Sequence, residues 1–320
     1  MTESDMEDDY LDMEDISIAG PMKMAHFELP RAKELRGAFK RCLREYYVSR
    51  MAGNLEVRGL VVTGESRVGK TREMKKLIGD FNKSETLMPD GRPGKIVSCL
   101  LSGRVTYKDL GIATLKALGY DIQGTRTQVY IWERVLFQAE QQGVIGIHYD
   151  ECQHVFRDGG KTNQHFLDSF KSMMKETRWP LMMILSGVPS LNKYIRSHEQ
   201  LDNLVEPVRF HEINVKRDEE YLARLLYLYA DQVEINIEQL VTQDFLTRLD
   251  YACSHRWGLV IELLIETLIE AKLKKKKQLR AKDFAKEFAL KTGTREKYSP
   301  FTAPDFREAF DSQKLLELQG

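Results

Sequence analysis

The sequence predicts an α/β protein in which a five-stranded parallel sheet lies between helices and is followed by a small all-helical domain. Three observations carry this prediction. A glycine-rich loop follows an apolar strand near residue 64, strands and helices alternate up to Val215, and beyond Val215 only helical spacing is found. Alternation of this kind is typical of a parallel sheet that is covered on both faces.

The first predicted element is a helix from Pro30 to about Arg50, because apolar residues recur there at helical spacing while the opposite face is basic. The predicted strands are short apolar runs bounded by turn residues, at 57–63, 95–101, 144–151, 181–186 and 207–215. The helices predicted between them span about 70–81, 110–118, 127–142 and 163–177, with a short helix after Pro189.

After residue 215 we expect helices at 218–231, 238–251, 258–277 and 281–291. The predicted organisation therefore has five parts, with a boundary between the two folded domains near residues 214–218. They are a disordered acidic tail (1–20), an N-terminal basic helix with its lead-in (21–56), the nucleotide-binding α/β domain (57–215), a helical lid domain (216–292) and a C-terminal tail (293–320).

Charge is separated into blocks although the formal net charge is zero. The first fifteen residues are rich in acids and lack a base, whereas residues 31–50 and 272–282 are strongly basic. No apolar stretch is long enough to cross a bilayer, and the acidic start is unlike a secretory signal. The four cysteines, Cys42, Cys99, Cys152 and Cys253, form no C-x-x-C pair, which favours reduced thiols and a cytoplasmic location.

The stretch GESRVGKT from Gly64 to Thr71 matches the phosphate-binding pattern G-x-x-x-x-G-K-[ST]. Its position between a strand and a helix favours a nucleotide site over a simple glycine turn, because backbone amides and the helix N-terminus then face the phosphates. We expect ATP and Mg²⁺, with Lys70 reaching the β and γ phosphates and Thr71 binding the metal ion. The candidate nucleotide contacts are Gly64, Glu65, Ser66, Arg67, Val68, Gly69, Lys70, Thr71 and Arg72.

Two adjacent acids, Asp150 and Glu151, end the strand that should lie beside the first one. We expect Asp150 to hold the metal ion and Glu151 to deprotonate the attacking water. His148, Asp150, Cys152 and His154 alternate along this segment, and a metal site made of them is conceivable but conflicts with the role of Asp150.

Ser186 ends the strand LMMILS, where its hydroxyl can sense the γ phosphate or the attacking water. An ordinary turn serine explains this position equally well.

The stretches GESRVGKT, HYDECQHV, LSGVPSL and GLVIELLIETLIEAK, with AKDFAKEFALKTG after them, together resemble an AAA+ ATPase. More narrowly, they are similar to the TniB branch of bacterial DNA-transposition ATPases, whose relatives include TnsC and the phage MuB protein. The similarity covers about residues 25 to 305.

This resemblance implies an ATP-dependent protein that binds double-stranded DNA and assembles on it as a homo-oligomeric ring or helical filament. Such proteins mark target DNA with a target-selector protein, recruit or activate a transposase, and disassemble on ATP hydrolysis in the bacterial cytoplasm. The resemblance further implies an arginine supplied to the neighbouring subunit's γ phosphate, for which Arg209 is the candidate and Arg196 the runner-up. The chain departs from many AAA+ lids, because Ile261 stands where an arginine is expected; Arg256 is a possible substitute.

DNA contacts in the resembling proteins follow the second strand, which makes Arg104 and Lys108 candidates, with Arg126 next. We expect contacts to phosphates and hence weak sequence preference. Ordinary solvated charge is the alternative for each residue, and the basic face of residues 31–50 suits DNA or a neighbouring subunit equally. Two other functions stay open at this stage: a helicase loader or replication initiator, and a nucleotide-switch signalling protein without DNA binding.

Overall fold

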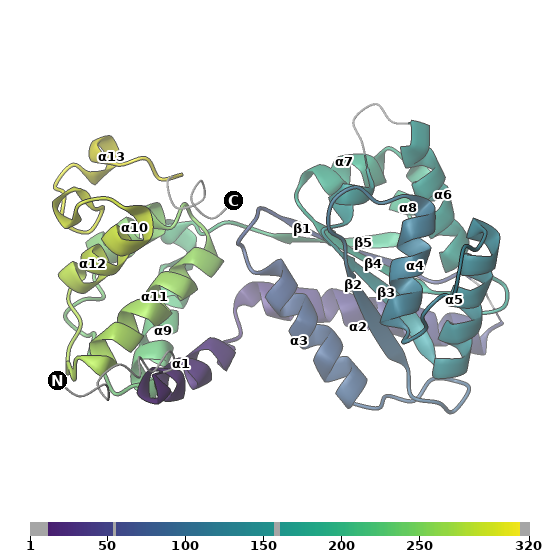
Figure 1. The fold of residues 1–320 in the computed structure, drawn as a ribbon, viewed down its shortest axis with the longest axis horizontal. Helices are drawn as coiled ribbons and strands as arrows, with labels where there is room; N and C mark the ends of the chain where they lie inside the picture. The colour runs from purple at the N-terminus through teal and green to yellow at the C-terminus, as the bar shows by residue number, and fades with distance from the viewer. Residues whose placement is uncertain (1–11, 54–55, 157–160, 314–320) are drawn as a thin grey trace, which may run out of the picture. The chain divides into compact units, whose positions relative to one another are not determined.

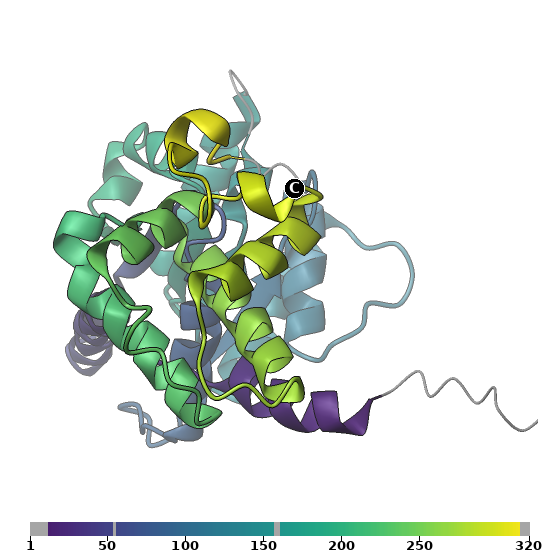
Figure 2. The same ribbon diagram turned by 90° about the vertical axis from the view of Figure 1, so that its left-hand side faces the viewer.

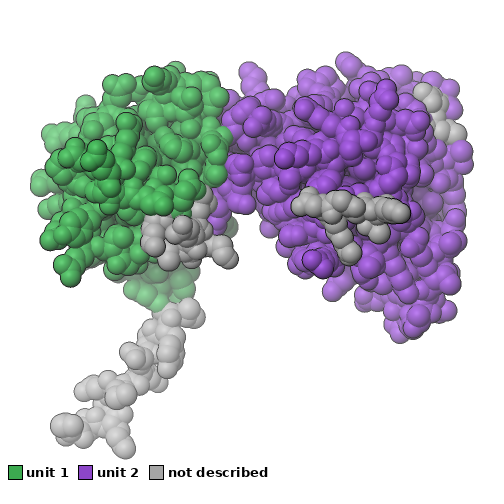
Figure 3. Space-filling model, turned by 90° about the horizontal axis from the view of Figure 1, so that it is seen from above, with its two compact units in different colours: residues 1–29, 212–320 green, residues 30–211 purple. Residues whose placement is uncertain are grey.

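The computed structural model describes residues 12–53, 56–156 and 161–313. The chain divides into two compact units, one made of residues 30–211 and the other of residues 1–29 and 212–320 (Figure 3). We call them the core unit and the helical unit, and each is described by itself.

A five-stranded parallel sheet in the order β2-β3-β4-β1-β5 forms the centre of the core unit, as predicted (Figure 1). The central strands β1, β3 and β4 are buried at every position, which explains their continuous apolar sequences. The strands are β1 (Gly59–Gly64), β2 (Lys95–Leu100), β3 (Val144–Asp150), β4 (Met182–Gly187) and β5 (Val205–Phe210).

The fifth strand differs from the prediction, since it spans Val205–Phe210 instead of 207–215. Proline lacks the N–H group that the interior of a sheet needs. However, β5 is an edge strand, and Pro207 is tolerated there opposite Val61 of β1.

Helices cover both faces of the sheet (Figure 1). On one face, α2 (Pro30–Met51) packs beside α3 (Lys70–Lys83), where the rings of Phe39 and Phe81 meet edge to face at 5.3 Å. The right-handed crossovers of a parallel sheet place the later helices on the other face. These are α4 (Tyr107–Ala117), α5 (Gln128–Gln142), α6 (Lys161–Met174), α7 (Ser190–Arg196) and α8 (Glu199–Asp202), with a 3₁₀ helix η1 (Cys152–Val155).

Other helices of the helical unit pack around α11 (Figure 2). The side chains of α11 are apolar nearly all round. A helix of that composition is stable only when other helices surround it. The elements of this unit are α1 (Met13–Met24), α9 (Val215–Gln232), α10 (Gln243–Ala252), α11 (Trp257–Leu273), α12 (Ala281–Thr292), η2 (Glu296–Tyr298) and α13 (Phe306–Ala309).

The prediction of a disordered tail over 1–20 is wrong for residues 13–20, which belong to α1; residues 1–11 lie outside the described residues. Asp12 caps this helix by accepting from the Glu14 N–H at 2.8 Å, and acids in the first turn complement the helix dipole. Met22 is buried, and Lys23 pairs with Glu266 of α11 at 3.0 Å. Among the described residues, Asp12, Glu14 and Asp15 therefore mark the N-terminus of a helix within the helical unit.

The other domain limits also shift. The units divide between residues 211 and 212, because the backbone N–H of Ile213 already bonds to the His255 carbonyl at 2.9 Å. The C-terminal segment is part of the helical unit: Arg248 donates to the carbonyls of Pro300 and Ala303 at 2.8 and 2.7 Å, and Phe301 is buried. The separate tail predicted from residue 293 is thus corrected over its described part.

Within the described residues, none of the helices has the length and apolar character needed to cross a membrane.

A pair of glycine substitutions tests the packing of the sheet. A Cβ on Gly59 would overlap the carbonyl oxygen of Met183 in β4, whereas one on Gly79 in α3 meets nothing within 4 Å. We expect Gly59→Ala to lower the free energy of unfolding by about 1–3 kcal/mol. Gly79→Ala should raise it by about 0.5–1 kcal/mol, because alanine favours helix over glycine. Urea unfolding measures both, and equal effects of the two substitutions would contradict this packing.

Candidate nucleotide-binding and hydrolysis site

The predicted phosphate loop lies between β1 and α3. Gly69 adopts a left-handed conformation, with φ 97°, that favours glycine, and it precedes α3 without a side-chain cap. Arg67 also has positive φ, at 64°. Because no capping side chain competes for the first N–H groups of α3, this 14-residue helix presents its positive end to the loop.

The side chain of Lys70 lies within the loop and bonds to its backbone. Its Nζ donates to the carbonyls of Gly64 and Glu65 at 2.8 and 2.9 Å, and only 5% of the residue is exposed. The loop therefore folds around a buried ammonium group, and that charge favours a phosphate within the loop.

Asp150, at the end of β3, bonds both to Thr71 after the loop and to β4. The expectation that its strand lies beside β1 is wrong, because β4 pairs with both strands and lies between them. Thr71 donates to Asp150 Oδ2 at 2.7 Å, and Ser186 donates to Asp150 Oδ1 at 2.6 Å. Because Thr71 donates its hydroxyl proton to Asp150, the lone pairs of the hydroxyl oxygen remain available to bind a cation. A hydroxyl and a carboxylate held together in this way fit Mg²⁺, which prefers oxygen ligands.

His148 extends this chain of hydrogen bonds into the sheet. Its Nε2 lies 2.8 Å from Ser186 Oγ, and its Nδ1 lies 2.7 Å from Ser98 Oγ. The single proton of Ser186 is donated to Asp150, so His148 Nε2 must carry the proton that Ser186 accepts. Burial lowers the pKa of His148 from 6.5 to about 4, which keeps the ring neutral at neutral pH.

Ser186 thus lies where the sequence places it, at the end of β4, but it is fully buried and its bonds are to Asp150 and His148. Its contact with the site runs through the Asp150 carboxylate. The role of His148 was missed because alternation along the strand suggested metal ligands. Among the described residues, no group of three His, Cys, Asp or Glu side chains could hold a metal ion.

Glu151 leaves the strand in a left-handed conformation, with φ 56°. Its Oε2 accepts from Gln153 Nε2 at 2.5 Å, while Gln153 Oε1 accepts from the Val188 N–H at 3.2 Å. No local sequence pattern singles out Gln153, because its bonds depend on how η1 packs against the end of β4.

Arg31, in the first turn of α2, is a second residue that the sequence did not single out. A Cβ built on Gly69 would lie 2.8 Å from Arg31 Nη2, and the guanidinium lies 5.6 Å from the centre of the Phe210 ring. A cation therefore stands against the phosphate loop. Other members of this basic face have different roles, since Arg41 pairs with Glu206 and Arg44 with Glu45.

The predicted trans arginine and its alternative are both exposed. Arg209 lies on the edge strand β5 in register with Thr63 of β1, and Arg196 ends α7. Neither residue joins the hydrogen bonds described above for Lys70, Thr71, Asp150 and Ser186. Arg67 is exposed as well, while Arg72 is half-buried in the first turn of α3.

The candidate DNA residues gather at one end of a helix pair. Tyr107 of α4 stacks on Trp132 of α5 at 4.6 Å, while Gln142 at the end of α5 donates to the Leu118 carbonyl at the end of α4. The two helices therefore run in the same direction. Arg104 and Arg126 lie in the loops that precede them and are exposed, and Lys108 in the first turn of α4 is half-buried.

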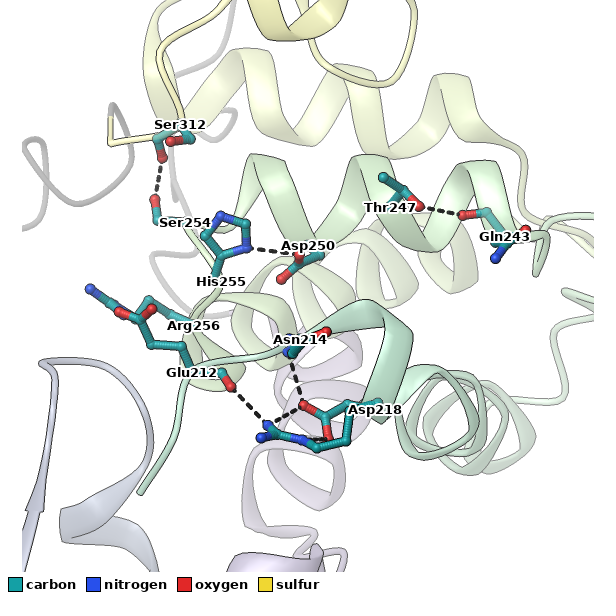
Figure 4. Close-up of polar contacts among 11 residues, drawn as sticks. Glu212, Asn214, Asp218, Gln243, Thr247, Asp250, Ser254, His255, Arg256 and Ser312 are labelled. Carbon is teal, nitrogen blue, oxygen red and sulfur yellow. Dashed lines mark hydrogen bonds and ion pairs between the residues drawn. The ribbon is translucent and has the colours of Figure 1, made fainter. Parts of the chain in front are cut away.

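In the helical unit, Arg256 precedes α11 and is nearly buried, where it pairs with Glu212 (Figure 4). The neighbouring His255 has φ 61°, and its Nδ1 lies 2.7 Å from Asp250 Oδ2, a contact that raises the pKa of His255. Arg217 also donates to the Glu212 carbonyl, at 3.2 Å. These bonds tie the start of the unit to the turn before α11, and Arg256 is engaged within its own unit.

Comparisons with known proteins agree with this architecture. A family model described as the bacterial TniB protein matches residues 30–217. None of the curated proteins compared with the chain matches it.

Similar solved structures include Cdc6p from Pyrobaculum aerophilum, with a TM-score of 0.59 and 12% identity over 87% of this chain and 71% of that one. The ORC2 protein of Aeropyrum pernix, solved as ADPNP–ADP complexes, has a TM-score of 0.57 and 11% identity over 84% and 71%. Aeropyrum pernix ORC1, in complex with DNA, has a TM-score of 0.59 and 11% identity over 88% and 71%. At these identities the likeness shows the fold, which is an AAA+ core followed by a helical part.

The buried imidazole generates a prediction for stability. The folded protein holds His148 with a lowered pKa, so the unfolded chain takes up a proton first as pH falls below 6.5. Between pH 6.5 and about 4 the nucleotide-free protein should lose about 3 kcal/mol more stability than His148→Gln, which does not titrate. Urea unfolding at a series of pH values measures this difference. Parallel curves for the two proteins would contradict a neutral buried His148.

Proposed function

Because the TniB family model matches more than half of this chain, the chain belongs to the TniB family, and we propose that it is an ATP-hydrolysing regulator of DNA transposition. In this proposal it assembles on double-stranded DNA when ATP is bound, selects the target with a selector protein, and recruits or activates a transposase. Hydrolysis then disassembles it. We place this activity on DNA in the bacterial cytoplasm.

The observation that carries the ATPase proposal is the set of bonds Thr71–Asp150–Ser186 beside a loop that encloses Lys70. Three strands contribute to it: β1 leads into the loop, β3 ends at Asp150 and β4 supplies Ser186. A structural cluster would have no need for an acid, 3% exposed, facing the N-terminus of a helix. A triphosphate with its cation accounts for this arrangement.

In the proposed reaction the amides from Gly64 to Thr71 hold the phosphates, and Lys70 and Arg31 offset their charge. Bound Mg²⁺ would be held by Thr71 and Asp150 and would supply charge neutralisation on the β and γ phosphates. Glu151 accepts the proton of the attacking water. Arg209 of an adjacent subunit is the candidate for transition-state charge, which makes assembly a condition for fast turnover.

The DNA proposal rests on the end of the α4–α5 pair. Arg104, Lys108 and Arg126 come together there with the N-termini of two parallel helices, and both features favour phosphates. One similar solved structure, ORC1, is described in complex with DNA. Recognition through phosphates would let the assembly form on many DNA sequences. In this proposal that suits a protein whose target is chosen by a separate selector protein.

A replication initiator is the second candidate, because the similar solved structures are Cdc6 and ORC proteins. The TniB match over residues 30–217 favours the transposition role. The two functions separate experimentally, since only a transposition regulator stimulates a transposase.

Replacing the proposed base tests the cycle. Glu151→Gln keeps the size of the side chain but cannot accept the proton, so hydrolysis should fall by at least about 100-fold while ATP affinity is kept. The variant should then stay on duplex DNA long after the wild type has dissociated. Glu199→Gln, an exposed position on α8, serves as the control. Normal turnover in Glu151→Gln would remove Glu151 from this role.

The DNA surface has its own test. Arg104→Ala and Arg126→Ala should each weaken binding to unrelated duplexes by similar factors and reduce the salt dependence of the binding constant, as a log–log slope, by about 1. The control is Arg178→Ala, an exposed arginine paired with Glu140 before β4, and it should change neither quantity. Fluorescence anisotropy at several salt concentrations gives both, and slopes equal to the wild type would exclude these arginines from the interface.

A further inference from the structure

Ser186 near the end of β4 and Val188 just after β4 are linked to Asp150 and Glu151 in two different ways. Ser186 donates directly to Asp150 Oδ1 at 2.6 Å. Two residues further on, the backbone N–H of Val188 donates to Gln153 Oε1 at 3.2 Å, and Gln153 Nε2 donates to Glu151 Oε2 at 2.5 Å. The Gln153 amide therefore joins Glu151 to backbone at the end of β4.

The orientation of this amide follows from its partners. A backbone N–H can only donate and a carboxylate accepts, so the oxygen of Gln153 must face Val188 and its nitrogen must face Glu151. Reversing the amide would set two donors against each other and an oxygen against a carboxylate. The amide oxygen of Gln153 thus needs a donor and its nitrogen needs an acceptor, and each has one in this arrangement.

Two backbone features make room for this arrangement. Glu151 adopts φ 56° and ψ 39°, a left-handed conformation that costs a non-glycine residue about 1–2 kcal/mol and persists only where neighbouring contacts hold it. Gly187 is the other feature, because a Cβ there would overlap Gln153 Oε1 and lie 3.2 Å from Leu191 Cδ2. The glycine at the end of β4 is therefore needed for Gln153 to reach Val188.

We propose that Gln153 is a positioning residue for Glu151, holding one carboxylate oxygen so that the other is presented to the attacking water. This inference rests on the proposed ATPase function, and it identifies Gln153 as a residue on which the rate of ATP hydrolysis depends. Gln153 does not touch nucleotide in this account; it acts through Glu151. Because a carboxylate on a strained turn samples several orientations without a tether, loss of the amide should lower turnover and leave binding intact. Misplacement of a catalytic group by about 1 Å can cost on the order of 100-fold in rate.

The test measures ATP affinity and single-turnover hydrolysis for full-length protein with duplex DNA. Gln153→Met keeps the length of the side chain and removes both hydrogen bonds. Gln153→Glu keeps the acceptor for Val188 but sets a like charge against Glu151. Gly187→Ala displaces Gln153 without changing it. Each variant should lose about 10- to 100-fold in hydrolysis rate with ATP affinity within about twofold of the wild type. Thermal melts confirm folding.

The matched control is Gln164→Met on α6, because Gln164 is exposed and its amide contacts a carboxylate, that of Asp168, at 3.4 Å. It should hydrolyse ATP at the wild-type rate. The decisive arm adds Gln153→Met to Glu151→Gln. If Gln153 acts through Glu151, the double variant hydrolyses ATP no more slowly than Glu151→Gln alone.

Three outcomes would overturn the inference: wild-type turnover in Gln153→Met, a loss of ATP affinity that accounts for its defect, or an equal further loss on the Glu151→Gln background. Each of these leaves the proposed function standing, provided that the wild type hydrolyses ATP. A wild-type protein without ATP turnover contradicts the proposed function itself, and the two failures are thereby distinguished.

Discussion

Strand β3 pairs with β4 in a register that sets Tyr149 beside Leu185, so the next residues along, Asp150 and Ser186, meet at the carboxyl end of the sheet. The hydrogen bond between them fixes the Asp150 carboxylate, and Thr71 then binds its other oxygen from the start of α3. A shift of the register by one residue would turn Asp150 away from both partners, because side chains alternate between the faces of a strand. The loop, the two acids and the helix that follows the loop all depend on this pairing.

The same pairing explains why so many polar groups are tolerated inside the sheet. His148 and Ser186 are both almost fully buried, and an unbonded polar group in such a place is costly. Here each group has a partner, and the chain of bonds runs from Ser98 on the edge strand β2 to Thr71 in the first turn of α3. The hydrogen bonds that the buried polar groups need therefore also fix the positions of the side chains in the site.

Local sequence patterns predicted the parts of this structure that depend on local chemistry. Apolar runs located the five strands, and the loop motif located Lys70 and Thr71, because both features are written in consecutive residues. Contacts between distant segments could not be predicted in this way, because Gln153 and Arg31 meet their partners only when η1 and α2 pack against the core. The segment 13–20 was misjudged for a related reason. Its acids suit a helix start, and the packing of Met22 that orders this helix cannot be inferred from composition.

The central claim is that a triphosphate bound at this loop controls assembly on DNA. Electron microscopy of the purified protein with duplex DNA, with and without a non-hydrolysable ATP analogue, tests it most directly. The account predicts ordered rings or filaments on DNA with the analogue and none without nucleotide. DNA binding that is absent, or that is the same in both conditions, would contradict it.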